Sequence, residues 1–313
     1  MALEQSHLLT DEIIHSKWDN SLTPLLSIRP GDIVEMDTRE ASDGQLEHDS
    51  SLAALESLDF GRIHPLTGPI LIEGAEPGDS IEIEVLELTP KGWGWTGIIP
   101  GFGLLAEDFT KPYLVQWDLT TDKAEFSTTG IQIPLDPFMG VMGVGMDEVG
   151  AHSTVPPRRN GGNIDIKQLN QGSRLFLPVL VPGALLSLGD GHAAQGDGEV
   201  CGTAIECPMN LRFRVNLHKN TNLQELQFFT MGNPHDRINQ KGYYVTTGHA
   251  PDLMEATKKS LRFMIDYLSR TYKLSAEEAY ILCSVAADLK ISEIVDAPNW
   301  IVSTFISQDI FPA

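Results

Sequence analysis

The stretch Gly189-Asp190-Gly191-His192-Ala193-Ala194-Gln195-Gly196-Asp197-Gly198-Glu199 holds three carboxylates and an imidazole, with glycines before and between them. Glycine lets the backbone turn sharply and approach a ligand closely. Carboxylate and imidazole groups ligate divalent metals and carry protons in hydrolysis. The stretch is therefore more typical of an active-site loop than of a packing element. A solvated surface loop is the alternative that its polarity would also allow.

The spacing inside this stretch predicts which side chains act together. If residues 190–192 are extended, Asp190 and His192 project to the same side and could bind one metal ion. Asp197 and Glu199 have the same spacing and form a second acidic pair. We expect one member of that pair to act as the general base.

The segment that follows, residues 200–206, predicts a strand of small residues that ends on Glu206. A carboxylate in an otherwise apolar strand needs a partner. A metal, an arginine or a substrate amide could each be that partner. We include Glu206 among the candidate metal ligands.

Three other segments carry polar side chains in constrained surroundings. Two prolines and a glycine fix the backbone around His64, which is a candidate metal ligand or a turn histidine bonded to a carbonyl. Asn163 and Asp165 follow a glycine pair, so Asn163 could bind a substrate amide and Asp165 could orient it, with an Asx turn as the alternative. Residues 32–37 predict a strand that carries Asp37, another candidate ligand, on its polar face.

Composition and charge narrow the class of protein. The chain has 313 residues, which favours two lobes, and its net charge of −21 argues against nucleic acid and anionic membranes as partners. The three cysteines have no CxxC spacing and fit a reducing compartment. Neither a signal peptide nor an apolar run of about 20 residues is visible, so we expect a cytoplasmic protein.

Most of the chain predicts short strands between turns, since glycine and proline recur throughout. Alternating apolar residues predict strands over 81–85 and 211–217, and residues 174–181 predict a buried strand. The glycine-rich residues 93–103 favour a loop pressed against the mouth of a pocket.

Two helices are predicted near the C-terminus. Asp252 and Glu255 resemble a capping box at the start of a helix that ends near residue 270. Ser275 and Glu278 have the same spacing at the start of a second helix that ends near residue 287.

The chain resembles the acetamidase/formamidase family of amide hydrolases from about residue 20 to about residue 305. The resemblance rests on four motifs: HPLTGPI with EGAEPGD (64–79), IPGFGLL (99–105), NGGNIDIKQL (160–169) and GDGHAAQGDGEVCGTAIE (189–206). It implies a mainly β fold with a sandwich-like or jelly-roll-like lobe, a smaller α+β part and C-terminal helices. We divide the chain into a β lobe over 1–190 and a part with strands and helices over 191–313. The resemblance also implies a homo-oligomer.

We therefore predict metal-dependent hydrolysis of formamide, acetamide and similar small aliphatic amides to the acid and ammonia. Zinc is the favoured ion, and calcium is an alternative or additional one. The predicted metal ligands are Asp37, His64, Asp190, His192 and Glu206. Glu199 or Asp197 would be the catalytic base, and Asn163 and Asp165 would bind the substrate.

Two alternatives stay open at this point. The first is a metal-free amidase that uses a cysteine or a carboxylate as its nucleophile. The second is a non-catalytic β-sandwich that binds a cation for structural reasons.

Overall fold

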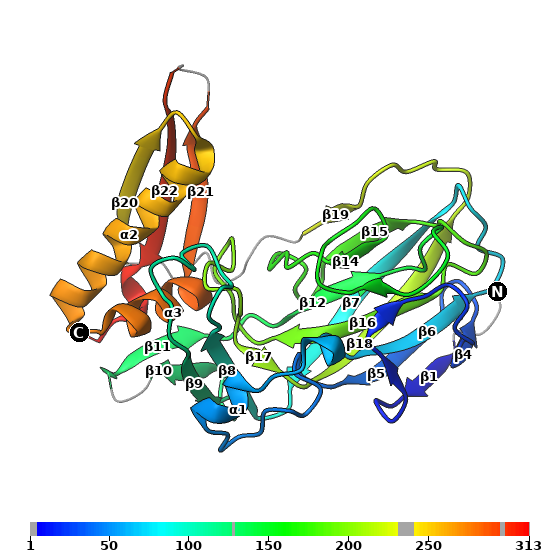
Figure 1. Cartoon of the computed structure of the whole chain (residues 1–313). Coiled ribbons are helices and arrows are strands. Elements are labelled where there is room, and N and C mark those ends of the chain that lie inside the picture. The colour runs from blue at the N-terminus through cyan, green and yellow to red at the C-terminus, as the bar shows by residue number, and fades with distance from the viewer. Residues whose placement is uncertain (1–4, 127–128, 231–240, 295–297, 313) are drawn as a thin grey trace.

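A computed structural model describes residues 5–126, 129–230, 241–294 and 298–312. Two large β-sheets form the body of the protein, and a module of strands and helices lies at the C-terminal end (Figure 1). The six-stranded sheet has the order β1-β5-β18-β7-β15-β19. Its strands are β1 (Ser6–Leu9), β5 (Ile33–Thr38), β18 (Met209–His218), β7 (Ser80–Pro90), β15 (Arg174–Pro178) and β19 (Gln227–Phe229).

Alternating apolar residues explain how this sheet packs. Ile81 and Ile83 of β7 and Phe213 of β18 are fully buried, so these central strands pack one face into the core. In β5, Val34 is fully buried whereas Glu35 is exposed. Strands β7 and β18 pair antiparallel along most of their length, which fixes the register at the centre of the sheet.

The nine-stranded sheet contains the predicted active-site stretch. Its main path is β14-β12-β16-β17-β8-β9, and β6 pairs with β16, β2 and β4 at the side. The strands are β14 (Gly161–Asn163), β12 (Phe138–Gly143), β16 (Leu186–His192), β17 (Glu206–Cys207), β8 (Trp93–Ile98), β9 (Tyr113–Asp118), β6 (Leu66–Ile72), β2 (Ile14–His15) and β4 (Leu26–Ile28). All seven residues of β16 are buried, so its polar end lies inside the protein.

Three smaller sheets complete the fold. Two are pairs: β10 (Lys123–Phe126) with β11 (Ile131–Pro134), and β3 (Lys17–Trp18) with β13 (His152–Ser153). The third has the order β20-β22-β21 and belongs to the C-terminal module, with β20 (Tyr243–Ala250), β21 (Ala287–Glu293) and β22 (Trp300–Ser307).

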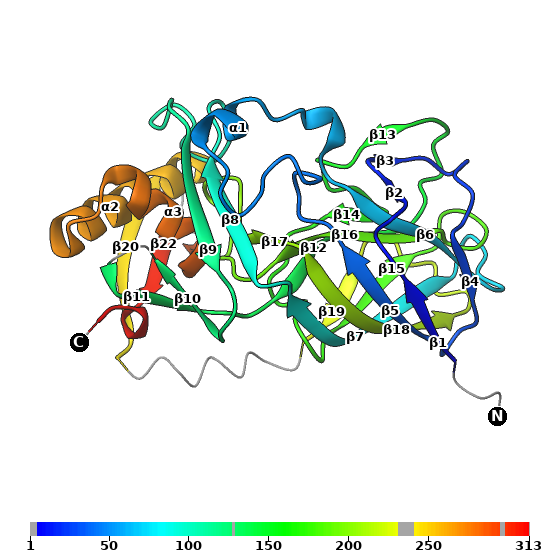
Figure 2. The ribbon, with the colours of Figure 1, turned by 90° about the horizontal axis from the view of Figure 1, so that it is seen from below.

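Helices α2 (Leu253–Tyr272) and α3 (Ala276–Ala286) belong to the C-terminal module, and the short α1 (Leu52–Glu56) lies near β8 and β9 (Figure 2). Asp252 caps α2 by accepting from the N–H of Glu255. Ser275 and Glu278 form a complete capping box at the start of α3. Short 3₁₀ helices cover Phe60–Arg62 and Gln308–Ile310. Among the described residues, no helix is long and apolar enough to cross a lipid bilayer.

The expectation of a mainly β fold with C-terminal helices is confirmed. One buried cluster includes Ile83 and Leu188 from the two large sheets and Leu261 and Tyr280 from the helices. The division at residue 190 stays a prediction, and β18, from beyond that point, lies between β5 and β7 of the same sheet.

Three local expectations need correction. Residues 93–98 form strand β8 rather than a loop, because they pair with β9 along the whole strand and with Glu206 of β17. In residues 200–206, only Glu206 is part of a strand. The N–H of Gly202 bonds within its own turn, to the carbonyl of Glu199, and the carbonyl of Val200 accepts from Leu104 in a loop. The predicted strand over 174–181 ends at Pro178.

Candidate active site

The buried end of β16 brings Asp190 and His192 to one point, and the neighbouring strand β17 adds Glu206. Glu206 is the cross-strand partner of His192. The Nε2 atom of His192 lies 3.1 Å from Oε2 of Glu206 and 3.3 Å from Oδ2 of Asp190. All three residues are at most 3% exposed. The three residues that the sequence predicts most directly therefore meet in the interior.

Two further carboxylates join this cluster from other loops. Asp165, Asp190 and His192 have ligand atoms within 4.8 Å of one another, and so do His192, Glu199 and Glu206. Asp165, Asp190 and Glu199 all have positive φ angles of 47°, 60° and 44°. Residues other than glycine rarely adopt this backbone conformation, because each one costs about 1–3 kcal/mol of strain. Residues strained in this way gather at functional sites.

The floor of the cluster is strand β12. A Cβ atom on Gly140 would lie 2.6 Å from Oδ2 of Asp190 and 2.7 Å from both Oδ1 of Asp165 and Cε1 of His192. The absence of a side chain at Gly140 therefore makes room for three site residues. Phe138 places its ring edge-on to the imidazole of His192, with 5.0 Å between the centroids.

Gln195 links two parts of the cluster. Its Nε2 donates to the backbone carbonyl of Asp165 over 2.9 Å, and its Oε1 lies 2.9 Å from Nδ1 of His192. Gln195 is 6% exposed. The side chain thus contacts both the loop of Asp165 and the ring of His192.

His64 lies at the edge of the cluster. Its Nε2 is 3.9 Å from Oδ2 of Asp190. The backbone N–H of His64 donates to the hydroxyl of Thr154 over 2.9 Å, and that hydroxyl donates to the carbonyl of Ile63 over 2.8 Å. The hydroxyl of Thr154, which is fully buried, therefore bonds to both the N–H and the carbonyl of the 63–64 peptide.

Several buried polar atoms in the cluster have no hydrogen-bond partner among the described residues. They are His64 Nδ1, Asn163 Oδ1, Asp165 Oδ1, Asp190 Oδ1, His192 Nε2 and Glu206 Oε2. Buried polar atoms are nearly always paired in folded proteins, so a group of such atoms directed to one point is suited to binding a ligand. Carboxylate oxygens with an imidazole nitrogen suit a divalent cation such as zinc. These residues therefore fit a metal ion.

Burial shapes the acidity of the carboxyl groups. It raises the pKa of Asp165 to about 7, with His192 opposing the shift and Asp190 adding to it. It raises the pKa of Glu206 to about 8 against the opposing effect of His192. Burial and the nearby Asp165 also hold the pKa of Glu199 well above its ordinary range. These carboxyl groups do not all ionise together near neutral pH unless a cation joins them.

The pKa values of Asp190 and His192 shift against the effect of burial, whereas that of His64 follows it. Burial alone would raise the pKa of Asp190, but His64 and His192 outweigh it and keep that pKa below its usual range. Burial would lower the pKa of His192, but Glu206 and Asp190 raise it well above 6.5. Burial lowers the pKa of His64. A metal ion binds the neutral imidazole, so metal binding would oppose the rise in the pKa of His192 that the two carboxylates cause.

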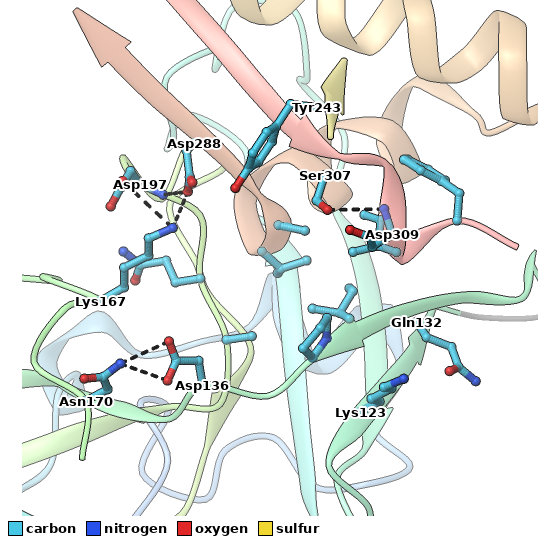
Figure 3. Close-up of a pocket in the computed structure, with 18 of the residues that line it drawn as sticks. Lys123, Gln132, Asp136, Lys167, Asn170, Asp197, Tyr243, Asp288, Ser307 and Asp309 are labelled. Carbon is cyan, nitrogen blue, oxygen red and sulfur yellow. Dashed lines mark hydrogen bonds and ion pairs between the residues drawn. The ribbon is translucent and has the colours of Figure 1, made fainter. Parts of the chain in front are cut away.

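The side chain of Asp197 contacts residues outside the cluster. Its carboxylate accepts a hydrogen bond from Gln168 over 2.9 Å and lies 3.9 Å from Nζ of Lys167, which also pairs with Asp288. These groups line a cavity of about 700 Å³ between the body and the C-terminal module (Figure 3). The close groupings of possible ligands among the described residues include Glu199 but not Asp197.

Asp37 is likewise outside those groupings within the described residues. Its carboxylate lies 2.8 Å from Nζ of Lys91 and accepts a hydrogen bond from the side chain of Asn210. Burial would raise the pKa of Asp37, but these two partners lower it below its usual value. The structure therefore gives this predicted ligand a lysine partner.

Asn163 lies next to the cluster in the sheet. It is the last residue of β14 and pairs with Val141, the residue after Gly140. The backbone N–H groups of Ile164 and Asp165 both donate to the carbonyl of Gly140. These bonds hold the segment from Asn163 to Asp165 along one edge of β12, the strand that forms the floor.

Helix α3 supports the loop that carries Glu199. The hydroxyl of Ser284 accepts from the N–H of Cys201 over 3.1 Å and donates to the carbonyl of Thr203 over 2.7 Å. The hydroxyl of Tyr280 donates to the carbonyl of Val200. The C-terminal module therefore fixes the segment between Glu199 and Glu206.

Sequence reasoning missed Gly140 and Phe138 and assigned no role to Gln195. The segment around Gly140 is apolar and carries no polar signal, so its part depends on the pairing of β12 with β16. Gln195 stands three residues after His192 within the quoted stretch, and that spacing was the available signal.

Comparison with known proteins identifies relatives along the whole chain. An acetamidase of Mycolicibacterium smegmatis is 30% identical over 284 residues, which cover 70% of each chain. A formamidase of Methylophilus methylotrophus is 28% identical and covers 96% of this chain and 90% of its own.

Solved structures show the same fold. A gamma lactamase from Delftia acidovorans superposes with a TM-score of 0.89 at 26% identity, covering 96% of this chain and 90% of its own. An acetamidase from Bacillus halodurans gives a TM-score of 0.68 at 32% identity, covering 96% and 97%. The sequence profile of the Acetamidase/Formamidase family matches residues 2–149 and 145–313. The chain belongs to the acetamidase/formamidase family of amide hydrolases.

Proposed function

We propose that this protein hydrolyses small aliphatic amides, with formamide and acetamide as the first substrates to test, and that a divalent cation is required. The observation that carries the proposal is the convergence of Asp190, His192 and Glu206, each of which has a buried polar atom without a hydrogen-bond partner among the described residues. The names of the relatives support the amide substrate, and the donor set supports the cation.

Asp190, His192 and Glu206 would hold the ion, with Asp165 and His64 close enough to complete the set. Zinc is the favoured ion because an imidazole nitrogen with carboxylates suits it, and calcium is the alternative. Such an ion supplies Lewis acidity, which polarises a carbonyl and makes water more acidic. Asp37 is left out of this set because its carboxylate is paired with Lys91.

Glu199 is the proposed proton carrier. Its high pKa suits a group that accepts a proton from the attacking water and returns it to the leaving nitrogen. Asp197 is a weaker choice because Gln168 and Lys167 occupy its carboxylate. Asn163 would accept a hydrogen bond from the amide nitrogen through its unpaired Oδ1. Asp165 would serve either as a ligand or as the residue that orients the substrate.

The high structural similarity to the lactamase favours a second candidate, the opening of small cyclic amides. The purified protein should be given formamide, acetamide, propionamide and a γ-lactam, with ammonia measured for the first three and the ring-opened amino acid for the last. Formamide and acetamide should differ only modestly, because one methylene is worth about 1–3 kcal/mol. No turnover of any of these amides would contradict the proposal.

Chelation tests the need for a cation. Dialysis against EDTA should abolish turnover, and Zn²⁺ or Ca²⁺ should restore it. Full activity in protein without metal by elemental analysis would favour the metal-free alternative. Burial raises the pKa of Cys201, Cys207 and Cys283, which weakens the case for a thiolate nucleophile. A Cys201→Ser variant should therefore keep its rate.

The structural-cation alternative predicts a different result for Asp190→Asn. If the ion only stabilises the fold, the parent protein releases no ammonia and the variant melts at a much lower temperature. If the site is catalytic, the variant loses its rate while the melting temperature of the metal-free protein changes little.

A further inference from the structure

We infer that Gln195 is a positioning residue that selects the His192 tautomer able to bind the cation and connects this ring to the Asp165 loop. The inference rests on the proposed metal centre. It follows from the hydrogen-bonding capacity of the Gln195 side chain and its two partners.

The orientation of the Gln195 carboxamide follows from its partner. The backbone carbonyl of Asp165 can only accept a hydrogen bond, so the group facing it over 2.9 Å must be the NH₂ of Gln195. The carboxamide oxygen must then face Nδ1 of His192, also at 2.9 Å. An amide flip would place two acceptors against each other at Asp165.

The tautomer of His192 follows from that orientation. A carboxamide oxygen only accepts, so Nδ1 of His192 must carry the hydrogen of this bond. In the neutral ring the lone pair is then on Nε2, the atom that lies between the carboxylates of Asp190 and Glu206. Nε2 has no hydrogen-bond partner among the described residues. The ring is thus prepared to ligate through Nε2, as histidines oriented by a neighbouring acceptor do.

Gln195 also connects two segments that both supply ligand atoms. His192 and Asp165 are 27 residues apart in the chain, and their ligand atoms lie within 4.8 Å. Gln195 is also one of the residues that line the cavity of about 700 Å³. Gln168 lines the same cavity but bonds to Asp197, so it provides a control that lies outside the cluster.

Three variants of the full-length protein test the inference. Gln195→Met keeps the size but can neither accept from Nδ1 nor donate to Asp165. Gln195→Glu keeps the acceptor for Nδ1 and loses the donor. Gln168→Met is the control. Zn²⁺ affinity is measured by competition with a chromogenic chelator, together with melting temperatures. We expect Gln195→Met to bind Zn²⁺ about 10–100-fold more weakly, Gln195→Glu to recover most of that loss, and Gln168→Met to match the parent.

A second measurement reports which nitrogen of His192 carries the proton. Nitrogen-15 NMR of the Zn²⁺-loaded parent should show a proton on Nδ1 of His192 and none on Nε2. A side chain that only filled space could be replaced by Met without changing either the Zn²⁺ affinity or this signal. If Gln195→Met does not fold, the inference is tested by the NMR signal of the parent and by the Zn²⁺ affinity of Gln195→Glu.

The outcomes separate this inference from the proposed function. If the parent binds Zn²⁺ and hydrolyses amides while Gln195→Met binds Zn²⁺ equally well, the inference is wrong and the proposed function stands. A proton on Nε2 of His192 in the loaded parent would also overturn it. If the parent binds neither Zn²⁺ nor Ca²⁺, the proposed metal centre and the inference both fail.

Discussion

His192 and Glu206 are directly opposed on neighbouring strands, and their side chains meet with Nε2 of His192 3.1 Å from Oε2 of Glu206. The register of β16 and β17 therefore creates the contact, although a loop of thirteen residues separates the two positions in the chain. Both side chains are buried, so the pair needs either a shared proton or a shared cation.

Replacing Glu206 by Gln should remove a ligand charge while preserving the shape of the side chain. We expect kcat/KM to fall about 10²-fold or more, the size of loss seen when an electrostatic contact leaves a buried site. The metal-free variant should be at least as stable as the parent, because a buried carboxylate is costly. Ammonia release, metal content and urea unfolding measure these effects.

Glu125→Gln is the matched control for this change, since Glu125 lies exposed on strand β10. It should leave rate and metal content unchanged. Equal rates in Glu206→Gln and the parent would remove Glu206 from the site.

Adding one methyl group at Gly140 should damage the site directly. The new Cβ would come within 2.7 Å of Asp190, Asp165 and His192 and push them apart. We expect a rate loss of about 10²-fold, since small displacements of reacting groups have effects of that order. Steady-state kinetics on Gly140→Ala, with its melting temperature, measure the loss.

Gly145→Ala is the control for the steric effect of an added methyl group outside the site. Its Cβ would meet Val181 and Leu185 rather than site residues. This variant should lose stability but keep its rate per folded molecule. A Gly140→Ala enzyme with normal kcat/KM would show that the site tolerates the displacement.

Removing the hydroxyl of Ser284 should loosen the segment between Glu199 and Glu206. Ser284→Ala leaves the N–H of Cys201 and the carbonyl of Thr203 without this partner in a buried setting, which costs about 1–3 kcal/mol. We expect a lower melting temperature together with a lower kcat.

Ser260→Ala is the comparison for Ser284→Ala. Ser260 is also fully buried but bonds to Thr257 and Thr304 in the C-terminal module. Its loss should lower stability without changing kcat. If both variants keep the parental kcat, α3 does not position the catalytic loop.

His15 should make stability depend on pH. Burial lowers its folded-state pKa below 6.5, and the ring bonds to the carbonyl of Lys17 and the hydroxyl of Ser187. The neutral ring is favoured in the fold, so its contribution is fully present above about pH 6.5 and is lost as the pH falls toward the folded pKa.

Unfolding free energies of the parent and His15→Gln should be compared between pH 8 and pH 5. The parent should lose more stability than the variant as the pH falls. Parallel curves would show that His15 does not contribute to the pH dependence. The difference between the two proteins cancels the effect of the other histidines.

Local patterns in the sequence predicted much of the fold. Alternation identified β7 and β18, and the capping residues Asp252 and Ser275 marked the starts of α2 and α3. These features depend on neighbours within a few residues, so the sequence displays them directly. Residues 93–98 were misjudged because their strand forms through partners elsewhere in the chain.

The sequence by itself determined the chemistry available to this protein: a dense set of carboxylates and imidazoles with glycines around them. Only the tertiary structure decided which of them meet. It brought Glu199 to the cluster and turned Asp197 toward Lys167, although the two are nearly adjacent in the chain. It paired Asp37 with Lys91 and gave Gly140 and Gln195 their places beside His192. The physical reason is that strand register and positive φ angles set the direction of each side chain, and both depend on contacts between distant segments.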